Sequence, residues 1–157
     1  MKLTSPDFFD GGLIPAKHTC NGENLRPKLF LTEVPEEAVS LVITMHDPDV
    51  PTSLRADGNW DHWSVWNLPK ETREINPEEL PKEAVEGITS FGKAGYGGPC
   101  PPDREHRYFW RAYALSKTLD LPKETNRFQL EKEITPYVLA EASLVGRYCQ
   151  PHLLKKD

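Results

Sequence analysis

The strongest constraint on the fold is an apolar run that ends in a proline-rich acidic corner. Residues 41–45 (LVITM) carry no charge, as expected for a strand buried on both faces of a sheet. The next segment, 47–51, reads Asp-Pro-Asp-Val-Pro. Because proline has no N–H to donate to a neighbouring strand, the chain must leave the sheet here. The sequence therefore predicts two carboxylates, Asp47 and Asp49, at the end of a central strand.

Other segments predict a mainly β fold. Fifteen prolines and ten glycines among 157 residues favour many turns and few long helices. We predict one domain, residues 1–157, folded as an antiparallel, Greek-key-like β-sandwich with one or two peripheral C-terminal helices. Besides the run above, the segments rich in strand-forming residues are 28–32, 62–68 and 107–115.

Helical signals are confined to short segments. Asn126 predicts a helix start that extends to Glu133. Thr135-Pro136 predicts a second start, since the apolar residues that follow have helical spacing. These residues are Val138, Leu139, Ala142 and Val145. A single helical turn is also expected at residues 76–80, where asparagine precedes proline.

The charge balance argues against two classes of partner. The net charge is −5, so no basic excess is available to neutralise nucleic acid or to bind an acidic membrane surface. The N-terminus lacks the apolar stretch of a signal peptide or transmembrane helix, and we expect a cytoplasmic protein. Exposed strand edges and surplus tryptophans also allow a homodimer.

The cysteines are odd in number and widely spaced. Cys20, Cys100 and Cys149 form no CxxC motif. For a cytoplasmic protein we expect free thiols rather than a disulfide. Cys100 lies between two prolines and lacks a helix N-terminus that would lower its pKa, so we expect a structural role rather than a nucleophilic one.

Polar residues are concentrated in three loops that the predicted strands bring to one end of the sandwich. They are the Asp47/Asp49 corner, the strand start at His62, and a glycine-rich loop that leads to His106 and Tyr108. Imidazoles, a phenol and glycine N–H groups suit a small anion. Asp47 fits such a site as an acceptor that orients a histidine and favours its charged form. Asp49 is expected mainly to cap its own turn.

Other interpretations of these residues remain open. His62 and His106 are also compatible with hydrogen-bonded histidines at the edge of a sandwich. His62, His106 and Asp47 could form a two-histidine, one-carboxylate metal site, although we favour no metal and no cofactor. Tyr108 is compatible with a core aromatic residue.

The blocks DPDVP, DHWSVWNLP, GYGGPCPP and HRYFW, in this order, resemble the phosphatidylethanolamine-binding protein family, in its bacterial and archaeal Raf-kinase-inhibitor-like branch. The segments IPAKHTCNGEN and LAEASLVGRY extend the resemblance over nearly the whole chain. It implies a β-sandwich with a small anion-binding pocket at one end. It also implies a cis peptide bond between Val50 and Pro51. The pocket residues implied are Asp47, Pro51, His62, Gly98, His106 and Tyr108, with Asp49, Gly97 and Pro99 as secondary members.

The resemblance implies a binding module and not an enzyme. Its ligand would be phosphate, a carboxylate or a phospholipid head group, and its output would be regulation of a protein kinase or serine protease. One alternative is a hydrolase or transferase that uses Asp47, His62 and His106. Another is a serine protease inhibitor that acts through an exposed loop at residues 54–59.

Overall fold

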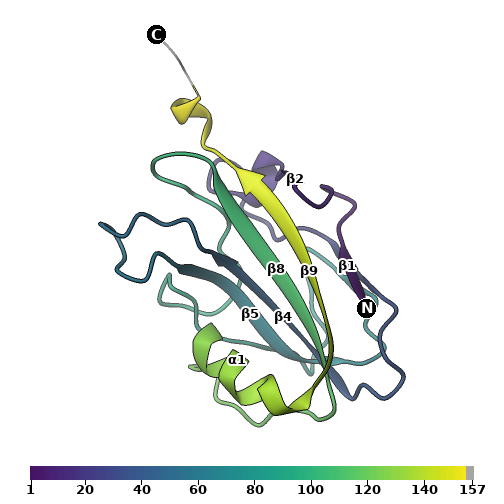
Figure 1. Cartoon of the computed structure of the whole chain (residues 1–157). Helices are drawn as coiled ribbons and strands as arrows, with labels where there is room; N and C mark the ends of the chain where they lie inside the picture. Colours follow the sequence, from purple (N-terminus) through teal and green to yellow (C-terminus); the bar gives the residue numbers. More distant parts are fainter. Residues whose placement is uncertain (155–157) are drawn as a thin grey trace.

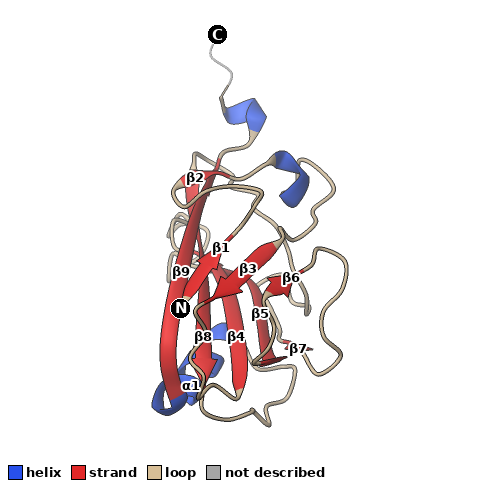
Figure 2. Ribbon diagram, turned by 90° about the vertical axis from the view of Figure 1, so that its right-hand side faces the viewer, coloured by secondary structure: helices blue, strands red, loops and turns tan. Residues whose placement is uncertain are grey.

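The computed structural model describes residues 1–154 and contains two packed β-sheets (Figures 1 and 2). The larger sheet has six strands in the order β2-β9-β8-β4-β5-β7, and all its ladders are antiparallel except the short β2–β9 pair. Its strands are β2 (Gly12–Leu13), β4 (Ser40–Asp47), β5 (Trp60–Pro69), β7 (Val85–Glu86), β8 (His106–Leu115) and β9 (Val138–Tyr148). The predicted mainly β sandwich is confirmed.

A smaller sheet covers one face of the larger one. It contains β1 (Lys2–Thr4), β3 (Leu29–Thr32) and β6 (Glu74–Ile75), in the order β1-β3-β6. Figure 2 shows these strands in front of β8, β4 and β5. Leu29 and Leu31 of the small sheet pack with Ile43 and Trp110 of the large sheet, and all four are fully buried. The main core therefore lies between the two sheets.

β4 is the central strand of the large sheet. It pairs with β5 on one side and β8 on the other, and all eight of its residues are buried. This burial confirms the buried strand predicted from the apolar run. The strand ends at Asp47, directly before the first proline, as predicted from the proline-rich corner. The predicted strands at 28–32, 62–68 and 107–115 correspond to β3, β5 and β8.

The outer face of the large sheet is covered at one end by α1 (Arg127–Ile134) (Figure 1). Asn126 caps this helix as predicted: its side chain accepts a hydrogen bond from the backbone of Gln129, and the Gln129 side chain accepts one from the backbone of Asn126. Leu130 and Ile134 are buried against Trp66 and other residues of the outer face.

Three local predictions are wrong. The second predicted helix is only a 3₁₀ turn, η2 (Thr135–Tyr137), which leads directly into β9. Residues 76–80 form no helical turn, although one was predicted there. Two further short 3₁₀ turns are η1 (Ala16–His18) and η3 (Pro151–Leu153). The Val50–Pro51 bond is trans and not cis as expected, and residues 1–154 contain no cis peptide bond. A helix long and apolar enough to cross a membrane is absent from residues 1–154.

Candidate functional site

A cavity of about 200 Å³ opens at the end of the large sheet where β4 ends and β8 begins. The antiparallel pairing of these strands brings Asp47 and His106 together, and β5 enters the same end at Trp60. The residues that line the cavity are Asp47, Val50, Leu54, Arg55, Trp60, His62, Phe91, Cys100, Pro101, Pro102, His106 and Tyr108. Four of the predicted pocket residues are therefore brought together: Asp47, His62, His106 and Tyr108.

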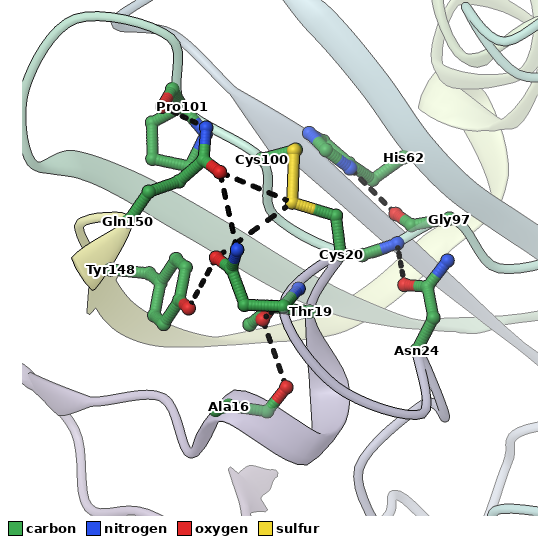
Figure 3. The surroundings of a disulfide bond; sticks show 12 residues. Ala16, Thr19, Cys20, Asn24, His62, Gly97, Cys100, Pro101, Tyr148 and Gln150 are labelled. Carbon is green, nitrogen blue, oxygen red and sulfur yellow. Dashed lines mark hydrogen bonds between the residues drawn. A yellow bond between two sulfur atoms is a disulfide. The ribbon is translucent and has the colours of Figure 1, made fainter. Parts of the chain in front are cut away.

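His62 is held in one tautomer by the glycine-rich loop. Its Nδ1 lies 2.6 Å from the carbonyl oxygen of Gly97 (Figure 3). Since a carbonyl only accepts, Nδ1 carries the proton, and Nε2 of the neutral ring is an acceptor. Burial lowers the pKa of His62 to about 4, against the opposing effect of the Gly97 hydrogen bond. His62 is therefore neutral at physiological pH, rather than the charged donor that the sequence suggested.

Tyr108 contributes a buried hydroxyl to the cavity. The residue is fully buried, and its hydroxyl has no hydrogen-bond partner within the described part of the chain. Its ring packs edge-on against His62, with ring centres 5.3 Å apart. Burial raises the pKa of Tyr108, and the nearby Asp47 carboxylate raises it further. The hydroxyl therefore keeps its proton and is available as a donor.

Asp47 orients His106, as predicted. Its Oδ2 lies 2.6 Å from Nδ1 of His106, and its Oδ1 accepts a hydrogen bond of 2.7 Å from the backbone N–H of Asp49. Burial raises the pKa of Asp47, although the hydrogen bond to His106 acts in the opposite direction. Nε2 of His106 lies 2.7 Å from Oδ1 of Asp103, so both ring nitrogens are occupied. His106 therefore has no free donor for a ligand.

Asp49 links β4 to β8 instead of lining the cavity. Its carboxylate accepts hydrogen bonds from Nε and Nη2 of Arg107 at 2.9 and 2.8 Å, and from the backbone N–H of Arg107 at 2.8 Å. The bonds from Arg107 lower the pKa of Asp49. This carboxylate therefore fixes the proline corner to the start of β8.

The predicted glycine and proline residues do not line the cavity. Gly98 donates its N–H to Oδ1 of Asn24, and a Cβ at this position would collide with the carbonyl oxygen of His18. Pro99 accepts a hydrogen bond from the N–H of Cys20, and Pro51 lines a separate surface hollow. Cys100, Pro101 and Pro102, rather than Gly98, are the residues of this loop that line the cavity.

Several wall residues were not predicted as site residues. Arg55 supplies a positive charge, and its guanidinium lies over the Trp60 ring, 5.1 Å from the ring centre. Trp60 also contacts Phe91 edge-on, at 5.4 Å between ring centres. The signal that could have found Arg55 is its place in the loop between the acidic corner and His62. Leu54 and Phe91 are exposed, so the wall carries apolar surface near solvent.

The expectation of free thiols is wrong for two of the three cysteines. Cys20 and Cys100 form a disulfide, whereas Cys149 is a free thiol (Figure 3). The disulfide ties the loop after η1 to the glycine-rich loop, and Gln150 supports the same region by donating a hydrogen bond of 2.8 Å to the carbonyl of Pro101. Cys100 therefore belongs to the cavity wall and is not a nucleophile.

Among residues 1–154, no group of three or more histidine, cysteine, aspartate or glutamate side chains is placed to hold a metal ion. The cavity lining also contains no serine, threonine or free thiol. Ser64, two residues after His62 on β5, pairs with Thr44 of β4 and does not line the cavity. The arrangement of hydroxyl, imidazole and carboxylate groups suits the binding of a small polar group.

Comparison with known proteins identifies the family. The sequence pattern of the family described as phosphatidylethanolamine-binding protein matches residues 4–149. The chain belongs to this family. Among its relatives, a UPF0098 protein of Chlamydia trachomatis is 42% identical over 148 residues, which cover 94% of this chain and 98% of the relative. A UPF0098 protein of Methanothermobacter thermautotrophicus is 39% identical over 153 residues, with the same coverage.

Solved structures of family members have the same fold. A crystal structure of a phosphatidylethanolamine-binding protein homologue from Chlamydia trachomatis superimposes with a TM-score of 0.91 at 40% identity, over 95% of this chain and 97% of that one. YbcL of Escherichia coli, described as a member of the mammalian phosphatidylethanolamine-binding protein family, gives a TM-score of 0.84 at 28% identity, over 94% and 96% of the two chains.

Proposed function

We propose that this protein is a non-enzymatic binding module for a small anionic group, either phosphate or carboxylate. The observation that carries the proposal is the Tyr108 hydroxyl, which is buried beside the cavity, near the Asp47 carboxylate, and has no partner at hydrogen-bonding geometry among residues 1–154. Leaving such a donor unpaired costs about 1–3 kcal/mol. A ligand oxygen that accepts from it would recover this free energy.

His62 favours a ligand group that brings its own proton. Its Nε2 is an acceptor in the neutral ring, so it pairs with a P–OH or carboxylic O–H group, or with an anion that binds together with a proton. A phosphate ester loses its second proton near pH 6. Binding is therefore expected to strengthen as the pH falls from 8 to 5.5, because the protonated form of the ligand becomes more abundant while the His62 ring stays neutral.

Charge near the cavity also favours an anion. Arg55 lies in the wall, where its Nε is 3.5 Å from Oδ1 of Asp57, and the negative charge of Asp47 is paired with His106. The remaining wall is largely apolar or aromatic, from Trp60, Phe91 and the two prolines that follow Cys100. An anionic head attached to a carbon skeleton fits this combination. Such a group occurs in small metabolites, phosphorylated side chains and lipid head groups.

We propose that occupancy of the cavity regulates a protein partner, such as a kinase or a serine protease. Family membership supports this regulatory role, which is also the one expected from the sequence resemblance. The loop at 54–59 is not independent of the cavity, because Leu54 and Arg55 line it. Inhibition by this loop should therefore respond to the ligand.

The sequence and the disulfide favour different cellular compartments for this protein. The sequence predicts the cytoplasm, whereas the Cys20–Cys100 disulfide favours an oxidising environment. Thiol alkylation of the protein taken directly from cells would distinguish the two: two reactive thiols at these positions favour the cytoplasm, and their protection favours an oxidising compartment.

Calorimetric titration with inorganic phosphate tests the proposed function. We expect tighter binding at pH 5.5 than at pH 8, and about tenfold or more weaker binding for Tyr108→Phe, because a hydrogen bond to a charged group contributes about 1.5–3 kcal/mol. Tyr113→Phe is the matched control, since Tyr113 lies on the same strand but its hydroxyl contacts Glu131 outside the cavity. Equal phosphate affinity for the wild type and Tyr108→Phe would contradict the proposal.

A further inference from the structure

His106 lies between two carboxylates that differ in their exposure to solvent. Its Nδ1 is 2.6 Å from Asp47, and its Nε2 is 2.7 Å from Asp103. The His106 side chain is fully buried and that of Asp47 is nearly so, whereas the Asp103 side chain is 39% exposed. Asp103 does not line the cavity, so any effect it has on a ligand must act through His106.

The hydrogen bonds define the protons of this group. An ionised carboxylate only accepts, so each ring nitrogen needs a proton to bond to its carboxylate. With both acids ionised, His106 is an imidazolium that offsets one of two negative charges. Without Asp103, Nε2 has no acceptor, and a neutral ring with one proton on Nδ1 still satisfies Asp47. The second carboxylate thus decides whether the ring is charged.

The other groups around His106 do not replace Asp103. The Tyr108 ring stacks on His106 from β8 at 6.5 Å between ring centres, and Tyr148 lies opposite it on β9. His62 of β5 lines the same cavity. None of these supplies a negative charge. Of the nearby cations, Arg104 lies 3.6 Å from Asp103, whereas Arg107 is bonded to Asp49.

We propose that Asp103 is a positioning residue of the anion pocket, which keeps the proton on Nε2 of His106 and so places a positive charge beside Asp47. This inference rests on the proposed function. With His106 charged, Asp47 repels a bound anion less. When the ring loses its charge, the full negative charge of Asp47 faces the ligand, and anion binding weakens.

Nitrogen-15 NMR of the histidine rings tests the charge without any ligand. In the wild type we expect both His106 nitrogens to be protonated at pH 7. In Asp103→Ala we expect Nε2 to lose its proton, and in Asp103→Glu to regain it. Glu105→Gln is the matched control, because Glu105 is an acid on the same segment that pairs with Arg147 at 2.6 Å, with no bond to His106.

Phosphate titration at pH 7 on the same variants tests the consequence. We expect about two- to threefold weaker binding for Asp103→Ala, because the positive charge lost from His106 lines the cavity, whereas the negative charge removed with Asp103 lies outside it and is partly screened by solvent. We expect recovery in Asp103→Glu and no change in Glu105→Gln. Thermal unfolding of each variant establishes that it is folded.

The two measurements separate the inference from the proposed function. If Nε2 loses its proton in Asp103→Ala but the wild type binds no phosphate, the role of Asp103 toward His106 stands and the proposed function fails. A ring that stays doubly protonated in Asp103→Ala overturns the inference. So does an equal loss of phosphate affinity in Asp103→Ala and Glu105→Gln.

Discussion

At the scale of single residues, the peptide of Gly97 determines what His62 offers to a ligand. The Gly97 carbonyl accepts from the ring at 2.6 Å, while the Gly97 N–H donates to the His62 carbonyl at 3.1 Å. A ring attached in this way cannot turn to exchange its nitrogens without breaking a buried hydrogen bond. The acceptor character of Nε2 is therefore a property of the folded loop, which the residue type alone does not reveal.

The lowered pKa of His62 makes stability depend on pH. The folded pKa is about 4 and the unfolded value is about 6.5, so the unfolded chain binds more protons between these values. The free energy by which neutral His62 stabilises the folded state is fully present above pH 6.5. It decreases by on the order of 3 kcal/mol as the pH falls toward 4. His46 has a similarly lowered pKa and adds to the same trend.

Urea denaturation at pH 4.5 and pH 7 measures this effect. We expect His62→Asn to lose less free energy of unfolding than the wild type over this interval, because its side chain cannot titrate. His152→Asn is the control, since His152 is exposed. An identical pH dependence for the wild type and His62→Asn would contradict the assignment.

At the scale of elements, β9 is a strand that the local sequence pattern did not predict. The apolar residues assigned to a helix also lie in a segment with alternating burial, whose inward-facing positions include the small residues Ala142 and Gly146. Small residues give a weak alternating signal. The pairing of β9 with β8 depends on contacts far apart in the sequence, and these override local helix preference. The strong apolar run of β4, by contrast, was sufficient.

The candidate site was also predictable only in part. Asp47, His62, His106 and Tyr108 lie at the ends of strands that their own sequence predicts, so their proximity followed from the fold. The Cys20–Cys100 disulfide joins loops 80 residues apart, and no local pattern specifies it. Likewise, only the tertiary structure brings Arg55 from its loop to the cavity wall.

The capping box of α1 supports a prediction at this scale. Asn126→Ala removes the side-chain cap of the helix that covers Trp66 on the outer face. We expect a loss of about 1 kcal/mol in the free energy of unfolding. Glu133→Ala, at an exposed position of the same helix, should have a much smaller effect in the same urea titration. Equal losses would show that the cap contributes nothing particular.

At the scale of the whole molecule, one disulfide joins the N-terminal loop to the wall of the cavity. Because it closes a segment of 80 residues, it restricts the unfolded chain. We expect the Cys20→Ser, Cys100→Ser double variant to lose about 2–4 kcal/mol in the free energy of unfolding. Cys149→Ser is the control, since Cys149 is a free thiol. A double variant as stable as this control would contradict the expectation.

The central claim is that the cavity beside Tyr108 and His62 holds an anion. The most direct test is a crystal soaked at pH 5.5 in arsenate, which keeps an O–H group as phosphate does and whose arsenic gives an anomalous diffraction signal. We predict a peak in the cavity with an arsenate oxygen within about 3.2 Å of the Tyr108 hydroxyl, and none there in Tyr108→Phe soaked alike. Arsenate bound only at surface sites of the wild type, with the cavity free of it, would contradict the account.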